Sequence, residues 1–111
     1  MRIKTQNYND VTVVELQGEL DSESVSPFQN SITDIVSKGK AGIVLDMSSV
    51  GFIDSQGLEH LLWAREHCNE HGCQLRLSGL DENCAKVLEL TRLINEFDRY
   101  SELAEAVKSF A

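Results

Sequence analysis

The run Ile43-Val44-Leu45-Asp46-Met47 constrains the fold of this chain more than any other segment. A half-exposed strand alternates apolar and polar residues, whereas this run is almost continuously apolar, which is typical of a central strand covered on both faces. Such strands occur in parallel sheets whose crossover connections are helices. The run therefore predicts an α/β fold.

The N-terminal segment predicts a β-hairpin. Ile3 to Tyr8 and Val11 to Leu16 are rich in β-favouring residues and are separated by Asn9-Asp10, a suitable two-residue turn. Gly18 is expected to end the second strand. Further strands are expected at Gln74 to Ser78 and at Phe97 to Tyr100.

Helices are predicted where apolar residues recur at three- and four-residue intervals. Each predicted helix is bounded by residues that commonly cap helices. We expect helices from Ser26, with Pro27 at its first position and Gln29 closing a capping box, to Gly39; from Ser55 to His71, ended by Gly72; from Asp81 as N-cap to Thr91; and from Ser101 as N-cap through Leu103, Ala106, Val107 and Phe110. The expected architecture is a single α/β domain over residues 1–111, with a small mixed sheet of four to five strands, an N-terminal hairpin and about four helices.

The net charge disfavours two classes of partner. The 111 residues carry a formal net charge of −8 without a basic stripe, so direct nucleic-acid binding and adsorption to an anionic membrane are disfavoured. No leader or apolar run of about 18 residues is present, and a cytoplasmic protein is expected. The three cysteines, Cys68, Cys73 and Cys84, have no disulfide-framework spacing and are expected to be free, buried thiols.

The turn Asp54-Ser55-Gln56-Gly57-Leu58 is the leading candidate for a functional site. Asp54 is placed to cap the following helix, which puts the Ser55 hydroxyl in its first turn. Unpaired backbone N–H groups and the positive end of the helix dipole lie there, so a phosphate on Ser55 would meet donors already aimed at it. Ser55 is therefore predicted to be a switch residue.

Four segments taken in order resemble the STAS family, and specifically the bacterial anti-sigma factor antagonists. They are Gly18-Glu19-Leu20-Asp21, Val44-Leu45-Asp46-Met47, the signature Phe52-Ile53-Asp54-Ser55-Gln56-Gly57-Leu58, and Ala85 to Leu93 with its Leu-Thr-x-Leu ending. The resemblance spans nearly the whole chain and implies the STAS fold.

The resemblance implies a phosphorylation-switched adaptor, not an enzyme, without a cofactor. Its unphosphorylated form would bind an anti-sigma factor that is also a serine kinase, and so free a sigma factor. Phosphorylation of Ser55 would block binding, and a serine phosphatase would reset the switch. Asp54 and Gly57 would support the switch turn, and Asp21 would lie in a polar loop close to Ser55. The protein is expected to be a monomer or a weak dimer.

Two residues depart from the pattern of the relatives. Gln56 stands where many have a second Ser or Thr, which removes a competing acceptor, although Ser48 and Ser49 in the preceding loop remain possible secondary acceptors. Arg92 replaces a glycine at the end of the third helix, where a left-handed conformation would cost a non-glycine residue roughly 1 kcal/mol.

The expected partner-binding residues are Gln56, Glu59 and Trp63. Helical phase puts Trp63 away from the leucines of its helix, and an exposed Trp is often a binding anchor. Packing against a neighbouring helix is an equally favoured reading of Trp63, because Trp is usually largely buried.

Other chemistries are weaker alternatives. His67-Cys68-Asn69-Glu70-His71-Gly72-Cys73 superficially resembles a metal cluster, but its ligands do not converge from one helix, and His60, His67 and His71 are interpreted as a solvated stripe. Cys84 with a lowered pKa, or a phosphoaspartate receiver at Asp46, would need partner residues that are not apparent. A further alternative is a STAS subunit of another regulatory or transport assembly that binds an ATPase or homologous STAS proteins.

Overall fold

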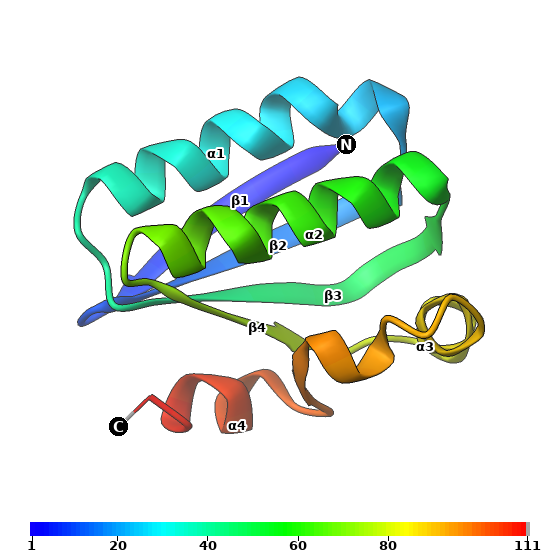
Figure 1. Ribbon diagram of the computed structural model, residues 1–111. Coiled ribbons are helices and arrows are strands. Elements are labelled where there is room, and N and C mark those ends of the chain that lie inside the picture. The colour runs from blue at the N-terminus through cyan, green and yellow to red at the C-terminus, as the bar shows by residue number, and fades with distance from the viewer. Residues whose placement is uncertain (111) are drawn as a thin grey trace.

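A computed structural model describes residues 1–110 as a five-stranded sheet with helices on both faces (Figure 1). The strand order is β1-β2-β3-β4-β5; β1 is antiparallel to β2, and the other neighbours are parallel. The predicted mixed sheet, N-terminal hairpin and four α-helices are confirmed. The elements are β1 Arg2–Tyr8, β2 Val11–Leu20, the 3₁₀ helix η1 Ser22–Ser24, α1 Val25–Ser37, β3 Gly42–Ile53, α2 Ser55–Glu70, β4 Gln74–Ser78, α3 Glu82–Leu90, the 3₁₀ helix η2 Ile94–Glu96, β5 Asp98–Tyr100 and α4 Leu103–Lys108.

The central strand β3 is covered on both faces, as its apolar run predicts. Ile43 and Leu45 belong to a large core cluster that also takes in apolar residues of α1 and α2. Val44, between them in the chain, belongs to a smaller cluster with Val11, Val13 and Ala106 of α4. Alternate side chains of a strand point to opposite faces, so α1 and α2 cover one face of the sheet and α4 covers part of the other (Figure 1).

Strands β2 and β3 are longer than the sequence predicts. Gly18 does not end β2: it has a φ of +118° inside the strand, beside a register shift in the pairing with β3, and the strand continues to Leu20. The irregularity lets β2 change register and continue, so a glycine here marks a bulge and not a stop. Ser48 and Ser49 likewise lie inside β3 and not in a loop, and both are exposed.

The predicted helix starts are confirmed for the two helices that an aspartate caps. They are wrong for the two helices where a serine cap was predicted. Asp54 Oδ1 accepts from Gly57 N at 2.9 Å, and Asp81 Oδ1 accepts from Cys84 N at 2.8 Å. The predicted Ser26 cap is wrong, because the chain is already helical at Ser22–Ser24 and the capping box is formed by Asp21 and Ser24. The predicted Ser101 cap is also wrong: α4 begins after Glu102, whose side chain makes no capping hydrogen bond.

The three cysteines are free and buried, as predicted. Cys84 Sγ donates to the Val50 carbonyl oxygen at 3.3 Å. Burial, together with the nearby Asp81 carboxylate, raises the pKa of the Cys84 thiol to about 12. The alternative of a Cys84 nucleophile with a lowered pKa is therefore wrong.

Candidate functional site

The predicted switch turn, Asp54-Ser55-Gln56-Gly57-Leu58, joins the end of β3 to the start of α2. Asp54 has extended backbone angles, and its side chain accepts from Gly57 N while its carbonyl oxygen accepts from Leu58 N at 3.0 Å. The cap fixes Ser55 as the first residue of a 16-residue helix, where its side chain is exposed. Within residues 1–110, no hydrogen bond engages the Ser55 hydroxyl. The predicted placement of Asp54 and Ser55 at the start of a helix is therefore confirmed.

Gly57 packs directly against the end of β2. A Cβ at this position would collide with the carbonyl group of Leu20, and the Asp54 N–H donates to the same Leu20 oxygen at 3.3 Å. The absence of a side chain at Gly57 is thus what lets α2 begin so close to β2. Gly57 therefore supports the turn sterically, because it allows close contact between α2 and β2, which are distant in the chain.

Asp21 lies on the neighbouring turn, immediately after β2. Its side chain accepts from Glu23 N at 3.0 Å, and its backbone N–H and carbonyl oxygen both bond to Ser24 Oγ. The Asp21 carboxylate is therefore committed to capping η1. Asp21 approaches α2 through its backbone: its carbonyl oxygen lies 3.2 Å from His60 Nε2.

His60 corrects the predicted histidine stripe. It is 5% exposed, stacks on Phe28 of α1 with ring centroids 6.4 Å apart, and joins α2 to the Asp21 loop. His67 and His71 remain on the outer side of α2, where His67 also stacks on Trp63 at 4.9 Å. Helical phase alone missed the role of His60, because the packing of α1 beside α2 buries the side of α2 on which His60 lies.

The three expected partner-binding residues differ in exposure. Gln56 and Glu59 are exposed on the first turns of α2. Trp63, one turn further on, is half-buried and packs partly against the core. Trp63 is thus partly packed against the core and not fully exposed. Gln56 and Glu59 are the accessible pair beside Ser55.

Sequence reasoning did not single out Phe52 as a surface residue. It is 50% exposed near the end of β3, three residues before Ser55, whereas its neighbour Ile53 is buried. Adjacent residues of a strand point to opposite faces, so the Phe52 side chain lies at the surface where that of Ile53 enters the core. The sequence could have indicated that Phe52 is exposed and Ile53 buried only if β3 had been predicted to continue to Ile53, because the alternation holds within a strand.

The switch turn lies in an acidic part of the chain. No Lys or Arg occurs in residues 5–37 or 41–64, which contain Glu19, Asp21, Glu23, Asp54 and Glu59. A phosphate on Ser55 would therefore have no cation supplied by these segments. Its nearest stabilising groups are the N–H donors at the start of α2.

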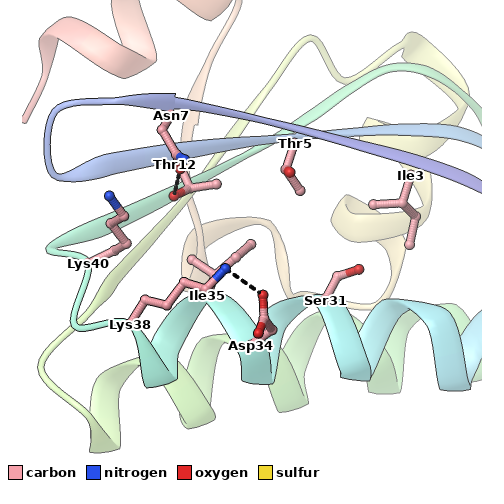
Figure 2. A pocket seen from close by; sticks show the side chains of 9 residues that line it. All are labelled: Ile3, Thr5, Asn7, Thr12, Ser31, Asp34, Ile35, Lys38 and Lys40. Carbon is pink, nitrogen blue, oxygen red and sulfur yellow. Dashed lines mark hydrogen bonds and ion pairs between the residues drawn. The ribbon is translucent and has the colours of Figure 1, made fainter.

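Other features of the described residues do not compete with this turn. Among residues 1–110, no three His, Cys, Asp or Glu side chains gather as a metal site, and no helix is long and apolar enough to span a membrane. Asp46 Oδ1 accepts from the N–H and the hydroxyl of Ser48, so this carboxylate is engaged within β3. A polar cleft of about 280 Å³ lies between α1 and the β1-β2 hairpin (Figure 2), and none of its lining residues belongs to the switch turn.

Comparison with known proteins identifies the family and the fold of the chain. The STAS domain model matches residues 2–106, so the chain belongs to the STAS domain family. The anti-sigma-B factor antagonist of Staphylococcus aureus is 24% identical over 93 residues, which is 84% of this chain and 86% of that protein. A putative anti-sigma factor antagonist from Thermotoga maritima has a similar structure, with a TM-score of 0.88, 26% identity, and coverage of 96% of this chain and 92% of the other.

Two further solved structures share the fold at 20% identity. The unphosphorylated form of the anti-sigma factor antagonist SpoIIAA has a TM-score of 0.81 and covers 98% of this chain and 96% of its own. A sulfate transporter family protein from Wolinella succinogenes has a TM-score of 0.82, covering 92% of this chain and 85% of its own. The STAS fold is therefore confirmed, and it occurs in proteins of different physiological roles.

Proposed function

We propose that this chain is a phosphorylation-switched adaptor and that Ser55 is its phosphoacceptor. In the unphosphorylated form it binds an anti-sigma factor that is also its serine kinase, and so frees a sigma factor. The observation that carries the proposal is an exposed, unengaged hydroxyl at the first position of α2, in a turn held by the Asp54 cap and the Gly57–Leu20 contact. Membership of the STAS family and similarity to anti-sigma factor antagonists support it.

The phosphate acts on the partner more than on the fold. Phosphorylation adds about −1.5 to −2 charges at neutral pH, and the N-terminus of α2 stabilises this charge without refolding. Opposite a partner carboxylate at ~4 Å, with an effective dielectric of ~20, each unit of charge costs ~4 kcal/mol before screening. A tenfold loss of affinity needs only ~1.4 kcal/mol, so a heavily screened phosphate still weakens the complex strongly.

The binding surface is centred on the first turns of α2. Gln56 and Glu59 are exposed beside Ser55, with the half-buried Trp63 behind them. A partner that covers these residues also covers the phosphoacceptor, so modification and binding exclude each other. A serine phosphatase then restores the binding form.

Two substitutions at Ser55 test the switch. Ser55→Ala is expected to bind the anti-sigma factor constitutively, and Ser55→Glu is expected to bind at least tenfold more weakly, because it places a carboxylate in the interface. Affinities are measured by calorimetry. Ser49→Ala, which removes another exposed serine from β3, is the matched control and keeps wild-type binding and phosphorylation.

Phosphopeptide mapping after incubation with the kinase and ATP completes the test. Modification at Ser55 alone supports the proposal, whereas modification at Ser48 or Ser49, or equal affinities of the two Ser55 variants, contradicts it. Affinity capture with Ser55→Ala as bait, read by mass spectrometry, identifies the partner class. Recovery of a transport ATPase or of homologous STAS proteins in place of a kinase-like anti-sigma factor would replace the transcriptional role with the alternative assembly.

A further inference from the structure

The two edges of the sheet differ in length. The edge strand β5 has three residues, whereas β1, at the opposite edge, has seven. β1 pairs only with β2 within residues 1–110, so the backbone N–H and C=O groups of every second residue face outward without a strand partner. Such an edge is a template for pairing with another strand.

The strand β1 is also poorly covered on its faces. Six of its seven residues are exposed, and Ile3 alone is half-buried. Figure 2 shows Ile3, Thr5 and Asn7 directed toward α1, across the cleft of about 280 Å³, with Ser31, Asp34 and Lys38 on the opposite wall. β1 is thus open to solvent along its edge and on much of its surface.

We propose that β1 pairs with β1 of a second copy of this chain, antiparallel and centred on Thr5. This register uses all seven residues, because it sets Thr5 opposite Thr5, Lys4 opposite Gln6, Ile3 opposite Asn7 and Arg2 opposite Tyr8. Two five-stranded sheets then become one continuous sheet. The proposal concerns the edge of the sheet and does not involve Ser55.

Charge favours this register over the one centred on Lys4. β1 contains two cations, Arg2 and Lys4, and no acidic residue. A register centred on Lys4 would set lysine directly opposite lysine, which is destabilising. In the Thr5-centred register neither cation faces another, Arg2 lies beside an exposed aromatic ring, and Lys4 keeps Glu15 of β2 as its opposite neighbour.

The pairing closes on itself at two copies. With a two-fold axis through Thr5, both chains contribute the same surface to the interface, and neither long edge stays unpaired. The remaining edge, β5, offers only three residues, so the association stops at a dimer. The single lysine of β1, Lys4, disfavours the register centred on itself. A lysine on an edge strand limits pairing, which fits a weak, concentration-dependent dimer.

Charge reversal at the centre tests the proposal. The average mass of the purified, unphosphorylated wild type is measured by sedimentation equilibrium over micromolar to millimolar concentrations, and is expected to rise from the monomer value of 12.4 kDa toward twice that value. Thr5→Lys and Thr5→Glu each place like charges opposite one another and are expected to stay monomeric. An equimolar mixture of the two is expected to dimerise, because lysine then faces glutamate.

Thr33→Lys makes the same charge change at an exposed threonine of α1 and is expected to dimerise like the wild type. Circular dichroism checks that each variant is folded, and Thr5→Glu serves alone if Thr5→Lys does not fold. A wild type that stays at monomer mass, a Thr5 variant that associates as the wild type does, or a mixture that stays monomeric overturns the proposal. Because no partner or kinase is present, these outcomes are independent of the Ser55 switch.

Discussion

Gly57 shows how one residue holds the candidate site together. Replacement by alanine improves helix propensity by about 1 kcal/mol, but the added Cβ meets the Leu20 carbonyl group, which is backbone and cannot move aside. We expect Gly57→Ala to lower the free energy of unfolding by a net value of about 1–2 kcal/mol, measured by urea denaturation. Gly51→Ala, at an exposed glycine of β3 with open space around it, is the control and is expected to change it by less than about 0.5 kcal/mol. Equal stability of the two variants would contradict the steric role.

Residue-level prediction from sequence succeeded where the determinants are local. Asp54 caps α2 through a contact three residues away, and Ser55 follows it, so both placements were readable from the turn itself. His60 was misplaced on a solvated stripe because its burial depends on Phe28 and Asp21, which lie 32 and 39 residues away. The Gly57–Leu20 contact was invisible for the same reason.

Among the elements, α3 ends on a conformation that suits glycine but is occupied by arginine. Arg92 has a φ of +63°, Arg92 N donates to Glu89 O and Leu93 N donates to Leu88 O, which is a Schellman ending. α2 ends in the same way with Gly72 at the left-handed position. We expect Arg92→Gly to raise the free energy of unfolding by about 0.5–1 kcal/mol, the relief of backbone strain less the greater freedom of glycine in the unfolded chain.

Arg92→Ala separates the backbone from the side chain. It removes the guanidinium but keeps a Cβ in the left-handed region, so its urea midpoint is expected to stay at or below that of the wild type. If Arg92→Ala stabilised the protein as much as Arg92→Gly does, the strain would lie in the side chain and the backbone argument would be wrong.

At the scale of the whole molecule, the two faces of the sheet are unequally covered. The face under α1 and α2 carries most of the buried apolar residues. In contrast, α4 has six residues and no side-chain cap, and Ala106 is its one buried residue in the small cluster on the other face. We expect the amides of α4 to exchange with solvent through local opening, and those of β3 and α2 only through global unfolding. Hydrogen-exchange mass spectrometry in low, increasing urea measures this. Protection of α4 that equals that of β3 at every urea concentration would contradict it.

The sequence by itself determined the elements whose signals are short-range. The apolar run of β3, the Asn9-Asp10 hairpin turn, the aspartate caps of α2 and α3 and the glycine endings after α1 and α2 follow from neighbours within a few residues, and together they predict the α/β fold and the position of Ser55. Only the tertiary structure decided the length of β2 and β3, the burial of His60, the contact of Gly57 with Leu20 and the exposure of Phe52. These depend on which segments lie side by side in the sheet, and no local pattern contains that information, because burial is a property of packed surfaces and not of sequence spacing.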